Sequence, residues 1–376
     1  MQKKEILFLA DHTSIYTKNL LSILKKKYNE EDFSVLSHGI YFKNGEKIFE
    51  RRNHKNKLLK LLEIKKMAKK IRARSVLMIH IHFLSPHYFF YRKIFKNTKV
   101  IITFWGSDLY RVPKKSKINK FLQKQIIKKA DIVTVAREKM IADFHKIFGF
   151  ENKPIYVTRF PIAKDLKLID SIKEQDLQLF REKYGVKDND FIITLGYSSD
   201  PGKNHEYMID EIVKLNQKFK NLFIIIPMTY GNSEHREKIK KYCEENLQKN
   251  NIQYVILENY MDNQEVAILR KITDVMINVQ NTDALSASMM ETLFAENIVI
   301  NGDWLNYDEL LENGVYFETI PELKSGVLSS KVEYILNNYN TLKEKTKVNK
   351  EIIYRMNNLD DIIEDWLKVY NMVLED

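Results

Sequence analysis

Two acidic side chains, Asp283 and Glu291, lie eight residues apart where an apolar run gives way to a helical pattern. Asp283 or Ser286 can cap that helix, whose free backbone N–H groups and partial positive charge stabilise an anion. Glu291 shares helical spacing with the apolar Ala287 and Phe294, so its carboxylate faces the core. Burying a carboxylate without a partner is costly. We therefore expect Glu291 to bind either ligand hydroxyls, such as those of a ribose, or a backbone N–H of the protein.

A second candidate ligand loop, Tyr-Ser-Ser-Asp-Pro-Gly-Lys-Asn-His, occupies residues 197–205 between a predicted strand and a predicted helix. Hydroxyls, free backbone N–H groups and a lysine ahead of a helix suit a phosphate. The same residue types also form ordinary turns. The phosphate interpretation assigns contacts to Ser198, Ser199, Lys203 and Asn204.

Apolar, β-rich runs alternate with helical patterns along the chain, which predicts two doubly wound α/β domains with parallel sheets. We place the domains at 1–165 and 166–355, with a last helix at 356–376 that packs back on the first domain. A polar stretch at 161–190, where the charge changes sign, is the predicted linker. The predicted strands are 6–10, 75–82, 100–104, 131–135, 191–196, 222–227, 254–257, 274–279 and 298–300. The predicted helices are 19–28, 58–71, 118–129, 205–219, 234–248, 264–271, 285–295 and 360–373.

Candidate acid–base residues follow two strands of the first half. Asp108 lies in the turn after the strand 100–104, at the carboxyl edge of the sheet, and would be the general base if the reaction inverts a sugar anomeric centre. His82, at the end of the strand 75–82, is the other candidate. The structural alternatives are a turn cap for Asp108 and a hydrogen-bonded core residue for His82. A retaining reaction needs no such base.

Charge is divided unevenly along the chain. Residues 1–160 carry 36 Lys and Arg against 13 Asp and Glu, a net +23, and residues 161–376 carry 25 against 37, a net −12. A basic half suggests an anionic partner, either nucleic acid or a membrane surface, although solvated lysines are the simpler alternative. Aromatic and basic residues mix at 83–93, and no nucleic-acid module is recognisable, so we favour an anionic membrane surface.

Compartment and cofactor expectations follow from what the sequence lacks. Cys243 is the single cysteine, and no run of about 18 uncharged apolar residues occurs, which predicts a cytoplasmic protein, peripheral on the inner face of the cell membrane. The only Asp-x-Asp string of the second domain's first part, at 188–190, precedes a strand, and there is no Cys/His cluster. We expect no cofactor and no metal.

Residues 255–315 resemble the donor half of GT-B glycosyltransferases, especially the large retaining family with two acidic residues eight positions apart at this turn. The resemblance implies two Rossmann-like domains facing a cleft. It also implies that Asp283 contacts the donor sugar, that the loop and helix N-terminus hold the diphosphate, and that Glu291 binds the ribose. This sequence has Asp283 for the usual Glu, and Ala284-Leu285 in place of the usual Gly-Phe-Gly.

The family also has an Arg after the glycine that corresponds to Gly196, and here that position is Tyr197. Arg137 or Arg159, near the end of the first domain, is expected to replace this cation at the diphosphate or to contact the acceptor.

Short motifs in both halves are also similar to bacterial 4-alpha-L-fucosyltransferase enzymes, which transfer N-acetylfucosamine from a TDP-sugar to lipid-linked acceptors. They are Trp-Gly-Ser-Asp-Leu-Tyr at 105–110, Pro-Met-Thr-Tyr at 227–230, and the serine-rich loop before residues 204–205. With the second motif included, the expected donor-binding residues are Ser198, Ser199, Lys203, Asn204, Met228, Tyr230, Asp283, Ser286, Ala287, Ser288 and Glu291.

The sequence thus predicts a metal-independent, hexosyltransferase-type glycosyltransferase that moves a sugar from a nucleotide sugar to a lipid-linked or other surface-glycan acceptor in bacterial polysaccharide biosynthesis. Three alternatives stay open: a nucleotide-sugar 2-epimerase of the same fold, a nucleic-acid-binding protein, and a GT-B-like subunit that only binds a partner. The nucleotide base, the sugar, the acceptor, the stereochemical outcome and the oligomeric state are not predicted.

Overall fold

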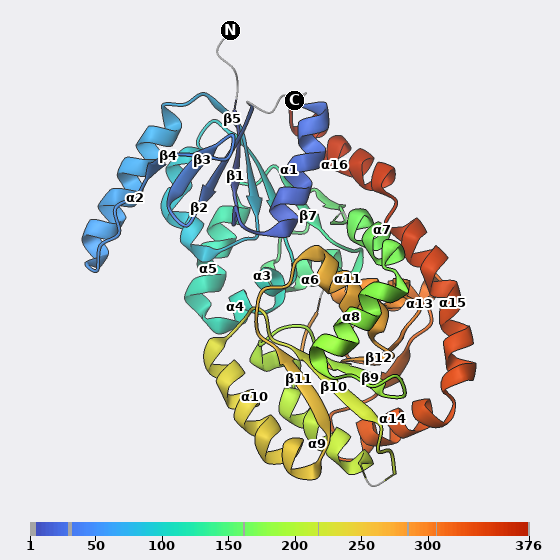
Figure 1. The fold of residues 1–376 in the computed structure, drawn as a ribbon. Helices are drawn as coiled ribbons and strands as arrows, with labels where there is room; N and C mark the ends of the chain where they lie inside the picture. The colour runs from blue at the N-terminus through green and yellow to red at the C-terminus, as the bar shows by residue number, and fades with distance from the viewer. Residues whose placement is uncertain are drawn as a thin grey trace. The chain divides into compact units, whose positions relative to one another are not determined.

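The chain forms two compact units, shown in Figure 1. The computed structural model describes residues 5–28, 32–160, 162–216, 218–283, 286–305 and 307–374. Unit 1 consists of Met1–Pro161 and Leu359–Asp376, and unit 2 of Ile162–Asn358. These divisions lie a few residues from the positions expected from the sequence.

Unit 1 is built on an eight-stranded sheet of order β4-β3-β2-β1-β5-β6-β7-β8 within its described residues. All neighbouring strands are parallel except in the β2–β3 and β3–β4 pairs. The chain order reverses between β1 and β5, and in open α/β sheets such a reversal leaves a crevice at the carboxyl ends of the strands. The strands are β1 (Glu5–Leu9), β2 (Phe33–Ser37), β3 (Ile40–Lys43), β4 (Glu46–Glu50), β5 (Val76–His82), β6 (Lys99–Thr103), β7 (Ile132–Val135) and β8 (Ile155–Val157).

The central strands of unit 1 are apolar and buried on both faces, so helices must cover both sides of the sheet. Sequence periodicity missed β2, β3, β4 and β8, which are short strands at the two sides of the sheet. The helices are α1 (Ile15–Lys27), α2 (Lys57–Arg72), η2 (Pro86–Phe95), α3 (Ser107–Tyr110), α4 (Val112–Lys115), α5 (Lys117–Ile127), α6 (Lys139–Phe148) and α16 (Leu359–Leu374).

The last helix, α16, belongs to unit 1, where it runs beside α1 (Figure 1). Trp366 and Tyr370 on α16 are buried in one apolar cluster with Phe8 of β1. The hydroxyl of Tyr370 lies 2.7 Å from Nδ1 of His80 on β5. The C-terminal segment therefore completes the core of the unit that contains the N-terminus.

Unit 2 has a six-stranded, all-parallel sheet of order β11-β10-β9-β12-β13-β14 within its described residues. The chain order reverses between β9 and β12, so the loops after these two strands flank the expected ligand crevice. The strands are β9 (Phe191–Leu195), β10 (Leu222–Pro227), β11 (Gln253–Leu257), β12 (Val275–Asn278), β13 (Ile298–Gly302) and β14 (Glu318–Ile320).

The segment 161–190, which the sequence predicts as a linker, is not an unstructured connection. It contains two helices, α7 (Ala163–Ser171) and α8 (Glu174–Tyr184). Leu166, Ile169 and Phe180 bury their side chains in the core of unit 2, whereas the polar face that suggested a linker is solvated. The remaining helices are η3 (Pro201–Lys203), α9 (His205–Leu215), α10 (Ser233–Asn246), η4 (Gln248–Asn250), α11 (Asn263–Ile272), α12 (Ala287–Phe294), α13 (Asp308–Glu312), α14 (Val327–Asn337) and α15 (Tyr339–Met356).

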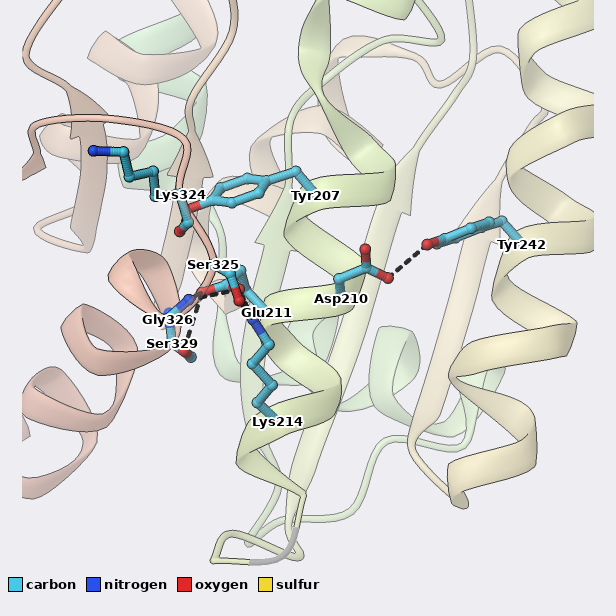
Figure 2. Close-up of polar contacts among 9 residues, drawn as sticks. All are labelled: Tyr207, Asp210, Glu211, Lys214, Tyr242, Lys324, Ser325, Gly326 and Ser329. Carbon is cyan, nitrogen blue, oxygen red and sulfur yellow. Dashed lines mark hydrogen bonds and ion pairs between the residues drawn. The ribbon is translucent and has the colours of Figure 1, made fainter.

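A buried carboxylate ties α14 to α9 (Figure 2). Glu211 on α9 accepts hydrogen bonds from the backbone N–H groups of Gly326 (2.9 Å) and Ser329 (3.0 Å) at the N-terminus of α14. The ammonium group of Lys214 also donates to Glu211. An acid from one helix thus caps another, which satisfies N–H groups that the second helix leaves open.

Within the described residues, none of the helices has the length and apolar character needed to cross a lipid bilayer.

Candidate functional site

The loops after β9 and β12 form one hydrogen-bonded edge in unit 2. The N–H of Asn281 donates to the carbonyl of Gly202 at 2.9 Å. The side-chain amide of Asn204 donates to the carbonyl of Val279 at 2.7 Å and to Oδ1 of Asn281 at 3.0 Å. Asn204 has a φ of 61°, a left-handed conformation that asparagine tolerates better than most residues. The two loops singled out in the sequence are therefore brought together at the reversal of strand order.

A cation and an acid on these loops are joined through one amide. Lys203 is buried, its ammonium group donates to Oε1 of Gln280, and it lies 3.3 Å from the centre of the Tyr197 ring. The Nε2 group of Gln280 donates to Asp283, as does the hydroxyl of Tyr307. Burial, followed by the charge of Asp283, raises the pKa of Tyr307 well above its usual value, so this phenol stays protonated and donates.

Three residues of this cluster were missed in the sequence: Gln280, Tyr197 and Tyr307. The signal for Gln280 was its place directly after a strand, between the two predicted loops. Tyr307 lies 24 residues beyond Asp283 and gave no local signal.

Glu291 is buried on α12, as its spacing predicted, and its partner is a side chain. The Nε group of Arg270, on α11, donates to Oε2 of Glu291 at 3.0 Å, and Nη2 of Arg270 donates to Oγ of Ser288 at 2.8 Å. Arg270 and Glu291 are only 5% and 8% exposed. Arg270 lies three residues after the apolar Ala267 on α11, so it shares the buried face of its helix, as Glu291 does on α12. This spacing was the signal that could have identified Arg270 from the sequence.

The other expected donor residues of unit 2 separate into loop, cap and core positions. The hydroxyl of Ser199 donates to the carbonyl of Tyr230 at 2.9 Å, and the Tyr230 side chain is exposed. Ser286 caps α12 by accepting from the N–H of Met289. Met228 is wholly buried in the apolar core of the unit, and its expected role in donor binding stays a prediction. Ser198 is buried, and Ala287 is partly buried in the first turn of α12.

His205 begins α9 at the end of the first loop; the sequence places it in a motif but assigns it no site role. A side chain on Gly196 would lie 3.4 Å from Nε2 of His205, and both ring nitrogens are buried without a hydrogen-bond partner among the described residues. Burial, the nearby His235 and Lys203 lower its pKa to about 3, so the imidazole is neutral at pH 7.

Unit 1 has a pocket of about 420 Å³ at its own reversal of strand order, beyond the carboxyl ends of β1 and β5. His82 and Trp105 line it, and their Nε2 and Nε1 atoms are buried with no hydrogen-bond partner among the described residues. Nδ1 of His82 lies 3.3 Å from Oγ1 of Thr17. Burial lowers the pKa of His82 to about 3, so its ring is neutral at pH 7. The remaining lining residues are Ala10, Asp11, Ser14, Thr17, His38, Phe83, Ser85, His87 and Tyr88.

Asp108 has a structural role, which speaks against its expected function as general base. The side chain is 0% exposed. It accepts hydrogen bonds from the backbone N–H groups of Leu84 (2.7 Å), Trp105 (2.8 Å) and Gly106 (3.1 Å). Burial raises its pKa to about 6 despite these bonds. A carboxylate enclosed by three backbone donors holds the turn and has no open face for an acceptor hydroxyl.

Arg137 and Arg159 both belong to unit 1. Arg137 is buried beside Tyr110, and the backbone carbonyl of Arg159 accepts from Nε1 of Trp366 at 2.9 Å. In unit 2, the structure places Arg270 against Glu291. The described residues contain no group of three or more His, Cys, Asp or Glu side chains arranged to hold a metal ion.

Residues 5–137 match the family model described as "Glycosyl transferase 4-like". No curated protein matches the chain significantly.

Solved structures give matches over nearly the whole chain. A glycosyltransferase from Rickettsia africae is 17% identical with a TM-score of 0.73, and 100% of each chain is covered. The Anabaena protein Alr3699/HepE in complex with UDP and glucose is 13% identical with a TM-score of 0.76, covering 98% of this chain and 99% of that one. Sucrose-phosphate synthase from Thermosynechococcus elongatus is 12% identical with a TM-score of 0.74, covering 99% of both.

The chain has the GT-B fold. Two Rossmann-like units with parallel sheets are its defining architecture, and here each unit has its own reversal of strand order. In this GT-B chain the loop cluster of unit 2 and the His82 pocket of unit 1 both lie at such positions, where ligands of α/β sheets bind.

Proposed function

We propose that this protein is a glycosyltransferase that takes a sugar from a nucleoside diphosphate sugar and attaches it to an acceptor hydroxyl. The observation that carries the proposal is the cluster of Lys203, Gln280 and Asp283 at the strand-order reversal of unit 2. In the reaction the bond between the anomeric carbon and the diphosphate breaks, a bond to the acceptor oxygen forms, and the acceptor proton is released. Lys203 and the N-terminus of α12 would stabilise the departing diphosphate.

Unit 2 would hold the donor. Asp283 would contact the sugar hydroxyls, and Glu291 would accept a hydrogen bond from the ribose through the oxygen that Arg270 leaves open, Oε1. The cation that the family has after Gly196 would be supplied by Arg270. The structures of the Anabaena protein with UDP and with UDP-glucose support a nucleotide-sugar donor and make UDP-glucose the first compound to test.

Unit 1 would hold the acceptor in the His82 pocket. The neutral His82 ring offers Nε2 to an acceptor hydroxyl. Its low pKa makes it a weak base until negative charge is bound nearby, because an anion favours the protonated ring. A lipid-linked or other surface-glycan acceptor, reached from the inner face of the bacterial membrane during polysaccharide biosynthesis, accounts for the +23 charge of residues 1–160. The reaction would be a metal-independent hexosyl transfer.

The test combines binding with turnover on the full chain. A panel of UDP-, TDP- and GDP-sugars is screened for a rise in Tm, which any ligand of the folded state produces. The best donor is then incubated with and without lipid-linked acceptors, and the products are separated by chromatography. Glycosylated acceptor and released nucleoside diphosphate support the proposal, and a panel that shifts no Tm and yields no product overturns it.

The same incubation separates the rival of the same fold. A 2-epimerase converts the donor sugar, or releases nucleotide, with no acceptor present. The anomeric configuration of the product, read by NMR, then decides whether His82 is needed as a base, since only inversion requires one.

A further inference from the structure

A second pocket of about 420 Å³ adjoins the His82 pocket in unit 1. Two histidines, His38 and His87, line both pockets, so the two lie next to each other. The second pocket lies among the β2–β3 turn, α2 and η2. We name it the basic pocket, and its lining residues are His38, Gly39, Arg51, Lys57, Lys60, Leu61, Ile64, His87, Phe90 and Tyr91.

The basic pocket is built for an anion. None of its ten lining residues is acidic, and within the described part of the chain Arg51, Lys57 and Lys60 form no ion pair. Nε of Arg51 is buried with no hydrogen-bond partner among the described residues. Burial, followed by the positive charge of His38, Arg51 and Lys60, lowers the pKa of His87 to about 4. Arg51, Lys57 and Lys60 therefore act on the same space, and none of the three is paired with a carboxylate among the described residues.

Apolar side chains continue outward from the basic pocket. Leu61 and Ile64 line it, while Leu58, Leu59 and Leu62 on α2 are 66%, 44% and 44% exposed. Phe90 on η2 is also exposed beside them, since η2 packs on α2. Exposed leucines among lysines on a helix are typical of a surface that meets lipid.

We propose that the basic pocket binds the phosphate or diphosphate of a lipid-linked acceptor, whose chain lies along the leucines of α2 and whose sugar end enters the His82 pocket. The inference deepens the proposed function and rests on it. Arg51, with Lys57 and Lys60, would hold the phosphate oxygens by charge-assisted hydrogen bonds. The order of chemistry along unit 1, apolar to cationic to His82, matches the order of parts in such an acceptor.

The test measures binding of the full chain to phosphatidylcholine vesicles with and without a polyprenyl phosphate. Vesicles containing phosphatidylglycerol report a general anionic surface, and inorganic pyrophosphate as competitor reports free phosphate. The variant Arg51→Gln/Lys60→Gln is compared with Lys114→Gln/Lys115→Gln, which removes two exposed charges from α4 of the same unit. A second variant, Leu58→Ser/Leu62→Ser, removes apolar contacts only.

We expect the pocket variant to bind polyprenyl-phosphate vesicles at least about tenfold more weakly, because charge-assisted hydrogen bonds are lost. The control pair should stay close to wild type, and the leucine variant should weaken vesicle binding but not pyrophosphate binding. The inference is overturned if the pocket variant loses as much binding to phosphatidylglycerol vesicles as to polyprenyl-phosphate vesicles, or loses no more binding than the control pair. It is also overturned if the leucine variant binds vesicles as wild type does. The donor-induced rise in Tm is measured on wild type and on every variant. If the donor does not raise the Tm of wild type, the result counts against the proposed function. If the donor still raises the Tm of the pocket variant and that variant binds vesicles as wild type does, the result counts only against the basic pocket.

Discussion

Arg270 donates from Nε to Oε2 of Glu291 across 3.0 Å inside unit 2, so the acid that we assign to the proposed donor site is held by a cation from the neighbouring helix. The sequence predicted either ligand hydroxyls or a backbone N–H as the partner of Glu291. The arginine satisfies one carboxylate oxygen and also binds Ser288, which fixes two side chains near the start of α12. Preorganisation of this kind leaves the second carboxylate oxygen oriented before any ligand binds.

Removing one member of this pair should destabilise the protein more than removing both. Arg270→Gln or Glu291→Gln leaves a buried charge without its counter-ion, and we expect a loss of about 3–5 kcal/mol in the free energy of unfolding. The double variant Arg270→Met/Glu291→Met should regain most of that loss. Urea unfolding measures each value.

The same set of variants tests the ligand role. If the pair of Arg270 and Glu291 binds the donor, the double variant keeps a raised donor KM although its stability returns. A donor KM that recovers together with stability would show that the pair serves folding alone.

Lys203 should matter for turnover more than for folding. Lys203→Gln removes the cation that the proposal places beside the departing diphosphate, and we expect kcat to fall by about 10²-fold or more, by analogy with the loss of one positioned donor. Lys249→Gln, at an exposed position of η4 in the same unit, is the matched control and should change neither kcat nor Tm. Steady-state kinetics on both variants is the measurement. Equal kinetics for the two would remove Lys203 from the chemistry.

His82 and Asp108 should respond to substitution in opposite ways. His82→Gln is expected to lower kcat by about 10²-fold or more in an inverting reaction. Its Tm should fall only slightly, because Nε2 of His82 has no described protein partner and Nδ1 has one long contact, 3.3 Å to Oγ1 of Thr17. Asp108→Asn is expected to lower Tm. The carboxylate of Asp108 accepts hydrogen bonds from backbone N–H groups, and the NH₂ group of an asparagine would place a second donor against one of them.

Kinetics and thermal unfolding of the two variants check this contrast. Since the pKa of free His82 is about 3, we also expect no limb near pH 6.5 from this residue in the profile of kcat/KM. A wild-type rate in His82→Gln would indicate either retention or a structural role.

Periodicity and spacing were enough to predict the alternation of strands and helices and the edge where Lys203 and Asp283 lie. The partners of these residues were not predictable. Arg270 and Glu291 are 21 residues apart on different helices, and nothing local in the sequence shows that α11 and α12 bring them together. The charged outer face of α8 dominates its composition, and for that reason the sequence predicts a linker there.

Residue type alone did not separate a structural role from a site role, and burial in the structure does. Asp108 and His82 both follow strands, and only the structure shows that one is enclosed by backbone donors while the other lines a pocket. The charge of the first half was visible at once, but its use was not, since Arg51 and Lys60 come from separate segments and converge only in the folded unit.

Acid should loosen the contact between α9 and α14 through Glu211. Burial raises the pKa of this carboxyl, but hydrogen bonds from Lys214, Gly326 and Ser329 outweigh it and lower the pKa below 4.5. Because the folded state holds the proton more weakly than the unfolded chain, this group stabilises the fold above about pH 4.5, and the contribution is lost as pH falls through the folded pKa.

Glu211→Gln should therefore flatten the fall in unfolding free energy on the acid side of pH 4.5. It should also lower stability at pH 7 by about 1–3 kcal/mol, since charged acceptors are lost at the end of α14. Glu312→Gln, exposed on α13, is the control. Urea unfolding from pH 7 to pH 3.5 gives both quantities, and an acid dependence in Glu211→Gln equal to that of wild type would mean that this helix contact does not depend on the charge of Glu211.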